Sequence, residues 1–393
     1  MPVVLRDVIG LLDRIYDPAW AEDWDAVGLV CGDPEQQVRR ILFAVDPAPR
    51  VAQEAVAWDA DLLVVHHPLL LKPVHSVAAT SPKGRVVHDL VRSGCALLCA
   101  HTNADAPAHG VNQALAAALG IPDADVILPA PAEPLDKIVT FVPHENAEQV
   151  RTAMTGAGAG SIGDYDSCTF TTHGEGRFRP LAGANPAIGR RGEVETVAES
   201  SVEAVVPRAK RLAVIAAMKA AHPYEEVAFD VFEMAALPAT GDRARGIGRI
   251  GRLPAPVPLR VFAEQVGAAL PATAHGVRVG GDPDRVVQTV AVTSGAGDFL
   301  LETVLGTDAD VYVTSDLRHH RAGEFLEHAG APALVDVAHW AAEWTWLPVV
   351  ERRLLHGLGE RGDTVETRVS TLVTDPWTFR VDADPDRPLR GAE

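Results

Sequence analysis

Residues 39–68 read RRILFAVDPAPRVAQEAVAWDADLLVVHHP, and this stretch predicts how the main domain folds. An apolar run, a Pro-rich turn, a helical pattern and a second apolar run follow one another, which is typical of a strand–helix–strand unit with parallel strands. The second run ends in two adjacent histidines, His66 and His67, followed at once by Pro68. Neighbouring side chains of a strand point to opposite faces, so this pair cannot line one core face. We therefore expect a site at the end of the strand.

Residues 286–320, VVQTVAVTSGAGDFLLETVLGTDADVYVTSDLRHH, repeat this order near the other end of the chain. Both copies carry Asp-Ala-Asp directly before their second strand, at residues 59–61 and 308–310. The second copy ends its strand in Thr-Ser-Asp and reaches His319 and His320 a few residues later. We therefore predict an α/β fold with a pseudo-duplicated main domain formed by both ends of the chain.

Each copy continues through a helix into a further strand that ends in histidine, with an acid four residues later. These pairs are His101 with Asp105 and His339 with Glu343. One such pair is a weak signal, because a strand-end histidine is commonly a surface or capping residue. Two pairs at equivalent points of a repeat favour a site. Ligands of open α/β sheets collect beyond the carboxyl ends of parallel strands, so we expect the side chains to converge on one crevice.

The converging groups are imidazoles and carboxylates, the ligands that zinc, iron and manganese take in proteins. They are more numerous than one tetrahedral ion needs, and they suit two divalent ions about 3.5–4 Å apart. The full set is His66, His67, His101, Asp105, His320, His339 and Glu343.

The middle of the chain predicts a separate domain. We expect the main domain to comprise residues 1–131 and 248–373, interrupted by an α+β insert at 132–247 whose βα–ββ–αβ order is ferredoxin-like. Within it, residues 167–181 predict a hairpin. The motif HPYEE at 222–226 is either a further metal or substrate element or a helix stop before proline with solvated acids. Residues 374–393 predict a polar tail with a disordered end.

Composition excludes some classes of function. The 393-residue chain carries a net charge of −18, which argues against binding nucleic acid or anionic membranes. No apolar run approaches the length of a membrane helix, and the N-terminus reads as an amphipathic helix, so we expect a cytoplasmic protein. The four cysteines form no CxxC pair and are expected to be small buried residues in a reducing compartment.

In order along the chain, five motifs resemble the GTP cyclohydrolase 1 type 2 family, also called the NIF-three-like family. They are WDAVGLVCGDP at 24–34, HHP at 66–68, HTNAD at 101–105, TSDLRHH at 314–320 and DVAHWAAEW at 336–344. The resemblance implies that two metal ions bind at His66, His67, Asp105, His339 and Glu343. It also implies that His101 orients Asp105 or substrate and that His320 is an acid/base or substrate contact, with Ser315 where the family usually has glycine.

The family name implies a small-molecule substrate, GTP, which is opened at C8 to release formate and form dihydroneopterin triphosphate. The resemblance further implies a ring-shaped homohexamer. Three functions stay open from the sequence: this reaction, metal-dependent hydrolysis of another nucleotide or phosphoester, and a non-enzymatic metal-binding scaffold whose insert senses or docks. Formate release separates the first from the second, whereas bound metal without turnover favours the third.

Overall fold

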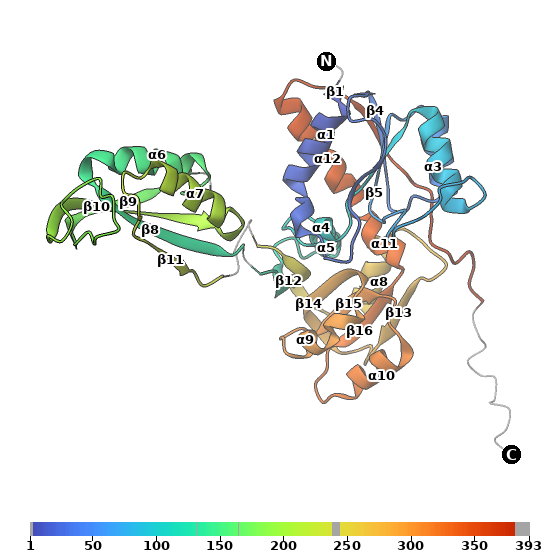
Figure 1. The fold of residues 1–393 in the computed structure, drawn as a ribbon. Coiled ribbons are helices and arrows are strands. Elements are labelled where there is room, and N and C mark those ends of the chain that lie inside the picture. The colour runs from blue at the N-terminus through green and yellow to red at the C-terminus, as the bar shows by residue number, and fades with distance from the viewer. Residues whose placement is uncertain (1–2, 132, 164, 238–243, 382–393) are drawn as a thin grey trace. The chain divides into compact units, whose positions relative to one another are not determined.

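The computed structural model describes residues 3–131, 133–163, 165–237 and 244–381, and the chain forms two compact units. The main unit comprises Met1–Ala130 and Thr240–Glu393, and the middle unit comprises Pro131–Ala239. The mixed α/β class predicted from the sequence is confirmed (Figure 1). The middle unit ends earlier than the predicted insert, because the strand that begins at Gly246 pairs within the main unit.

One sheet of the main unit comes from the first half of the chain and a late strand. Its order is β17 (Glu366–Val369), β4 (Arg40–Ala44), β5 (Leu62–Val65), β6 (Ala96–Cys99) and β2 (Gly28–Cys31). All neighbours are parallel except β2 and β6. Helices α2 (Pro49–Ala57) and α3 (Pro82–Ser93) connect the three central strands. Val65 pairs with both Ala44 and Cys99, so these strands end at one edge.

The second sheet comes from the later half. Its order is β13 (Val277–Gly280), β16 (Ala333–Val337), β15 (Val311–Ser315), β14 (Val286–Ala296), β12 (Gly246–Pro258) and β7 (Asp125–Pro129). Strands β14, β15 and β16 are parallel, with α9 (Leu301–Leu305) and α10 (His319–Glu327) between them. The two halves therefore share a β–α–β–α–β order, and the pseudo-duplication itself stays a prediction.

The second aspartate of the repeated Asp-Ala-Asp element forms equivalent hydrogen bonds in both halves. The carboxylate of Asp61 accepts hydrogen bonds from the backbone N–H groups of Arg39 and Arg40, at 2.7 and 3.0 Å. The carboxylate of Asp310 accepts from Gln288 and Thr289, both at 2.8 Å. In each half, the acid that precedes the second strand therefore holds the start of the first strand.

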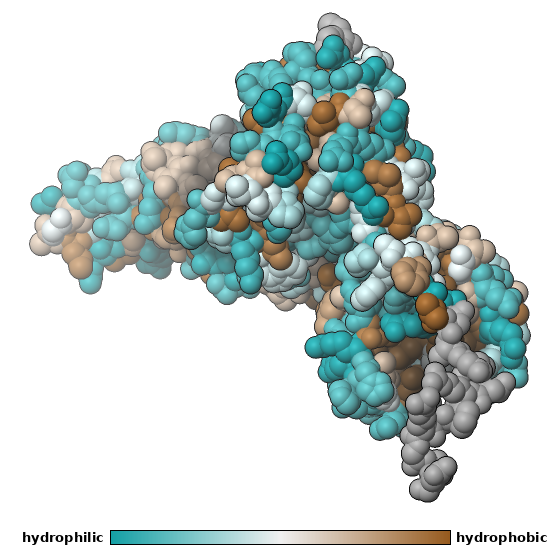
Figure 2. All heavy atoms as spheres, turned by 90° about the vertical axis from the view of Figure 1, so that its right-hand side faces the viewer, coloured by the Kyte–Doolittle hydropathy of each residue, from teal (hydrophilic) through white to brown (hydrophobic). Residues whose placement is uncertain are grey.

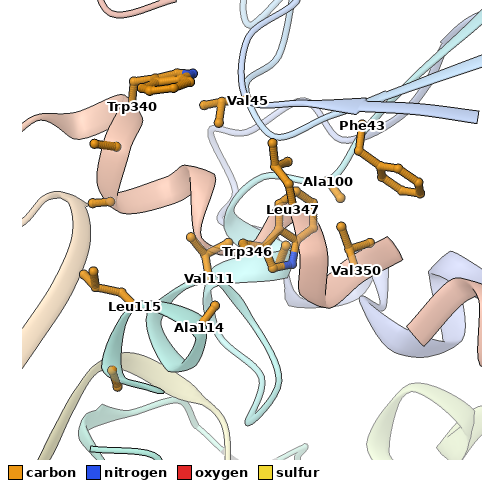
Figure 3. Close-up of a cluster of buried hydrophobic side chains, with 14 of the residues drawn as sticks. Phe43, Val45, Ala100, Val111, Ala114, Leu115, Trp340, Trp346, Leu347 and Val350 are labelled. Carbon is orange, nitrogen blue, oxygen red and sulfur yellow. The ribbon is translucent and has the colours of Figure 1, made fainter. Parts of the chain in front are cut away.

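Helices pack between the sheets around one apolar core (Figure 3). They are α1 (Leu5–Ile15), α4 (Thr102–Asp105), α5 (Val111–Ala118), α8 (Leu259–Ala269), α11 (His339–Trp344) and α12 (Leu347–Glu360). Trp346 is fully buried at its centre, and its indole N–H donates to the Tyr16 hydroxyl at 3.0 Å. The Trp346 ring lies 5.5 Å from the ring of His66. Burying one large apolar side chain contributes roughly 1.5–3 kcal/mol, so this packing holds His66 firmly.

The middle unit is a four-stranded antiparallel sheet with two helices on one face. Its elements are β8 (Leu135–Pro143), α6 (Ala147–Gly156), β9 (Thr169–Phe178), β10 (Glu195–Pro207), α7 (Arg211–Ala221) and β11 (Phe229–Glu233). The sheet order is β11-β8-β10-β9. This β–α–β–β–α–β order is that of ferredoxin-like domains. Alternate residues of β8 and β10, such as Val142 and Val202, pack beneath the helices.

The predicted hairpin within residues 167–181 is wrong. Residues 169–178 form the single strand β9, which pairs along its whole length with β10, so the hairpin connects these two strands instead. The sequence Gly174-Glu175-Gly176 looks like a turn, but neither glycine has a positive φ and the backbone stays extended. Glycine inside a strand commonly marks a place where another group approaches the backbone closely.

The remaining surface features are ordinary. The face shown in Figure 2 is mainly hydrophilic, with hydrophobic side chains in small separate patches. Strands β1 (Val3–Val4) and β3 (Gln37–Val38) pair as a short antiparallel ribbon. The four cysteines are free thiols. Cys95 and Cys99 are buried, as predicted, whereas Cys31 and Cys168 are only partly buried, which corrects that prediction. Among the described helices, none is long and apolar enough to cross a membrane.

Candidate metal centre

The end of β5 places two histidines at the edge where the parallel strands stop. Strand β5 is completely buried and ends at Val65, so the chain emerges from the sheet at His66. The backbone N–H groups of His66 and His67 donate to the carbonyl of Val45, at 3.1 and 2.9 Å. These bonds fix the backbone at the point where it leaves the strand.

In both histidines, Nδ1 forms a hydrogen bond to a neighbouring oxygen and Nε2 faces the carboxylate of Glu343. His66, 1% exposed, donates from Nδ1 to the carbonyl of Ala100 at 2.9 Å, and its Nε2 lies 3.5 Å from Glu343 Oε1. His67 donates from Nδ1 to Asp46 Oδ1 at 2.8 Å, and its Nε2 lies 3.1 Å from Glu343 Oε2. Metal-binding histidines are held in this way, with the second nitrogen bound to a carboxylate or carbonyl.

The second half contributes His339 and Glu343 from consecutive turns of α11. His339 donates from Nδ1 to Asp316 Oδ2 at 2.6 Å, and its Nε2 lies 2.8 Å from Glu343 Oε1. Gly295 of β14 lies directly against this pair. A Cβ at residue 295 would lie 2.9 Å from Glu343 Oε1 and 3.3 Å from His339 Nε2. With φ at +71°, Gly295 suits the backbone and leaves room for both side chains.

The fourth imidazole is His101, at the start of α4. Its Nδ1 donates to Asp25 Oδ1 at 2.8 Å, and the other oxygen of Asp25 accepts from the backbone N–H of Thr102 at 3.0 Å. The His101 ring lies 5.1 Å from the His66 ring. Asp105, one turn along α4, lies with Oδ1 3.8 Å from His66 Nε2. Both predicted residues of this motif therefore lie beside the strand-end histidines.

Burial and charge act against each other in this cluster. Burial alone would raise the pKa of Glu343, but His67, His339 and His66 hold that pKa well below its usual range. Burial would lower the pKa of His67, but Glu343 and Asp46 raise it to about 10. The same effects, with Asp316 in place of Asp46, raise the pKa of His339 to about 11. Glu343 is therefore held as a charged carboxylate. A divalent ion bound here would displace protons from the histidines.

The donors fit a divalent metal. Two groups have ligand atoms within 4.8 Å of one another, and His67 belongs to both: His66, His67 and His101, and His67, His339 and Glu343. Glu343 is 3% exposed, and its Oε2 has no hydrogen-bond partner of good geometry among the described residues. An unsatisfied buried carboxylate oxygen is costly unless a ligand binds it. The His/Glu groups can therefore hold a metal ion.

His320, which the sequence predicts as an acid/base or substrate contact, lies apart from these residues. It is exposed in the first turn of α10, where its ring lies 5.1 Å from the ring of His319. None of the contacts described for the cluster involves it. The strand end that precedes it contributes Asp316 instead, and the role of His320 stays a prediction.

A cavity of about 270 Å³ opens beside His67 and His339. Its lining is Asp46, His67, His275, Asp316, Ala338, His339, Trp340, Thr374, Asp375, Pro376 and Trp377. The start of the predicted polar tail therefore forms one wall, where the Thr374 hydroxyl donates to Asp46. Asp375 is 9% exposed, and burial raises the pKa of its carboxyl. The predicted disordered end falls largely on residues 382–393, which lie outside the described residues.

Sequence reasoning missed the carboxylates that orient the imidazoles. Asp316 directly follows β15 and Asp46 is the second residue after β4, so both sit at the edge that the parallel-strand argument selects. The same rule predicts both acids when it is extended from histidines to carboxylates. Asp25 comes from a loop before β2, and no strand-end pattern indicates it.

Comparison with known proteins gives consistent results. The chain matches the Duf34/NIF3 (NGG1p interacting factor 3) family over residues 3–376. A Mycobacterium tuberculosis protein named "GTP cyclohydrolase 1 type 2 homolog" is 51% identical over 380 residues, which covers 96% of this chain and 98% of the relative. A Bacillus subtilis protein of the same name is 36% identical over 374 residues, with 95% and 98% covered.

Solved structures agree with the sequence relatives. The crystal structure of a Bacillus cereus protein related to NIF3 is 34% identical, with a TM-score of 0.75, and the match covers 97% of this chain and 100% of that chain. A Staphylococcus aureus protein, SA1388, is 25% identical with a TM-score of 0.81, covering 96% and 99%. Because these matches extend over nearly the whole chain, this protein belongs to the DUF34/NIF3 family.

Proposed function

We propose that this chain is a divalent-metal-dependent hydrolase that holds two ions and acts on GTP. The observation that carries the proposal is the convergence of three imidazole Nε2 atoms, those of His66, His67 and His339, around the buried carboxylate of Glu343, with each ring fixed through Nδ1. His101 lies beside His66 and His67. The proposed ligands are His66, His67, Asp105, His339 and Glu343, and zinc, iron and manganese all suit them.

The chain's own residues prepare the site before any ion arrives. Asp46 and Asp316 hold the rings of His67 and His339 in fixed orientations, so little rearrangement is needed on binding. When bound, paired divalent ions supply Lewis-acid activation of water for hydrolysis. Asp25 fixes the tautomer of His101, so that His101 Nε2 can hold or pass a proton beside the cluster.

The cavity beside the ligands receives the substrate. The Trp340 side chain, 5% exposed, gives it an apolar wall, and Asp375 Oδ2 is a buried oxygen without a partner among the described residues. A donor group on the substrate would satisfy that oxygen. GTP is the first substrate to test, because the relatives in M. tuberculosis and B. subtilis carry the name "GTP cyclohydrolase 1 type 2 homolog".

A second candidate is hydrolysis of another nucleotide or phosphoester at the same site. The cavity lining contains neither lysine nor arginine within the described part of the chain, and its volume of about 270 Å³ is small for a nucleoside triphosphate. These two features favour a smaller and less charged substrate than GTP. The ring-shaped homohexamer and the cytoplasmic location stay predictions.

The test measures metal per chain and formate release from GTP on the same samples, purified without chelator. The variant is His339→Ala with Glu343→Ala. The matched control is His356→Ala with Glu360→Ala, a pair with the same spacing whose side chains are 79% and 69% exposed. We expect about two ions per chain and formate release in wild type and control, and loss of both in the site variant.

Other outcomes separate the candidates. Two ions without formate would reject GTP and direct the search to phosphoesters and other nucleotides. Bound metal with no turnover of any nucleotide or phosphoester would reject the hydrolase and favour a metal-binding scaffold. A wild-type protein that binds no divalent metal would overturn the proposed centre itself.

A further inference from the structure

A second cavity lies entirely within the middle unit, on the face of the sheet opposite α6 and α7. Its volume is about 730 Å³, which is within the usual range of small-molecule sites. Phe141, Glu199 and Ser201 line it, and they alternate along β8 and β10 with residues that pack beneath the helices. Two loops, 179–188 and 224–228, complete the walls. Nothing in the metal centre accounts for this cavity.

The loops around the cavity are held in place by hydrogen bonds. The backbone N–H of Asn185 donates to Glu225 Oε1 at 2.7 Å and ties one loop to the other. Arg191 Nε donates to the carbonyl of Ala184 at 2.6 Å, and the N–H of Gly192 donates to the carbonyl of Pro180 at 2.8 Å. The cavity is therefore formed before a ligand enters, which lowers the entropic cost of binding.

Gly174 and Gly176 of β9 line the cavity. They are the glycines that made this strand resemble a hairpin turn in the sequence. A Cβ on Gly174 would meet nothing within 4 Å, so this position faces open space. A Cβ on Gly176 would collide with Oε2 of Glu199, whose carboxylate lies across the strand at that point. The glycines therefore make room for a ligand and for the Glu199 side chain.

Glu199 is the most buried charged side chain in the lining of the cavity. The Tyr224 hydroxyl donates to Glu199 Oε1 at 2.8 Å, and the Tyr224 ring packs edge-on against Phe178 with centroids 5.6 Å apart. Glu199 is half-buried, whereas the other charged side chains of the lining are exposed. Those are Glu175, Arg177, Arg179, Glu225 and Glu226. No Lys, Arg or His within the described ranges forms an ion pair with Glu199.

We propose that this cavity binds a small organic cation, a protonated amine on an apolar body. Its ammonium group pairs with Glu199, and its body packs against Phe141, Phe178 and Tyr224. A half-buried carboxylate attracts a cation more strongly than an exposed one, and aromatic faces add cation–π attraction. The motif at 222–226, open from the sequence, therefore contributes Tyr224 and two further acids to a ligand site. This proposal does not depend on the metal centre.

The test uses three probes with one indole body and different charge: tryptamine, tryptophol and indole-3-propionate. Binding to the full chain is followed by titration calorimetry. We expect tryptamine to bind at least about tenfold more tightly than tryptophol, and indole-3-propionate to bind weakest. Tryptamine affinity should fall as salt is raised. Equal or tighter binding of the neutral or anionic probe, or no binding of tryptamine, would overturn the proposal.

Two variants locate the binding. Glu199→Gln keeps the shape of the side chain and should remove the advantage of tryptamine over tryptophol. Gly174→Leu should fill the cavity and weaken all probes. The matched control is Glu203→Gln, on the same strand and face but outside the cavity lining, where Glu203 pairs with Lys137. If Glu203→Gln weakened tryptamine binding as much as Glu199→Gln does, the site would lie elsewhere.

Discussion

The strands β5 and β15 occupy equivalent places in the two halves, yet their ends do different work. After β5, His66 and His67 both turn Nε2 into the cluster. After β15, Asp316 orients a ring from a later helix, and the neighbouring His319 and His320 are exposed. The two halves share the same order of strands and helices, but the residues that follow β5 and β15 have different roles. Sequence repetition is therefore a guide to the scaffold, and each side chain must be placed separately.

The largest effect should come from His67, which belongs to both groups of potential ligands. We expect His67→Ala to remove nearly all bound metal, whereas His339→Ala, in one group only, should remove about half. The loss in affinity for His67→Ala should be at least about 100-fold, the upper end of what orienting residues cost. Metal per chain by mass spectrometry checks this. Equal loss from both variants would mean that the halves contribute equally.

Gly295 tests how closely β14 must approach the second-half ligands. Gly295→Ala should destabilise the fold by about 1–2 kcal/mol because of its positive φ, and should also lower metal content, since the new Cβ would displace Glu343. The control is Gly94→Ala, where φ is +76° and a Cβ meets nothing within 4 Å. Thermal unfolding and metal content are measured for both. If Gly94→Ala lost metal equally, the contact with Glu343 would not be the cause.

The orienting acids sharpen the comparison between halves. Asp46→Asn and Asp316→Asn each keep the size of the side chain but weaken the hold on a ligand ring, so each should reduce metal affinity about 10–100-fold. Asp46→Asn should have the larger effect, because it acts through His67. Asn tolerates the φ of +57° at residue 316, so backbone strain does not confuse the result. Competition with a metal-sensitive dye gives the affinities; a larger loss for Asp316→Asn would contradict this order.

Much of the site followed from periodicity and position. Apolar runs that stop at His66 and at His339 predicted parallel strands whose ends meet, and that geometry places both residues in the cluster. Resemblance supplied the choice of Asp105. The HxxxE spacing alone does not distinguish a site from a surface pair, because His356 and Glu360 have the same spacing and lie exposed on α12. What separates the two pairs is burial, which depends on the whole fold.

Other features depend on contacts that no local pattern carries. Asp25 reaches His101 across 76 residues, and Thr374 reaches Asp46 across 328. The Gly-Glu-Gly of β9 reads as a turn from composition, and only pairing with β10 keeps it extended. Such tertiary contacts override local turn preference.

The smallest effect is expected at His320, where sequence and structure point in different directions. If the site is built only from residues that contact the cluster, His320→Ala should leave metal content and affinity unchanged, whereas His101→Ala should alter them. Formate release separates the roles further. Unchanged metal with reduced turnover in His320→Ala would place this histidine at the substrate, brought there by a movement of α10 or by a second copy of the chain. Unchanged metal content and turnover would show that His320 is a surface residue without a role in the site, unlike His66 and His67.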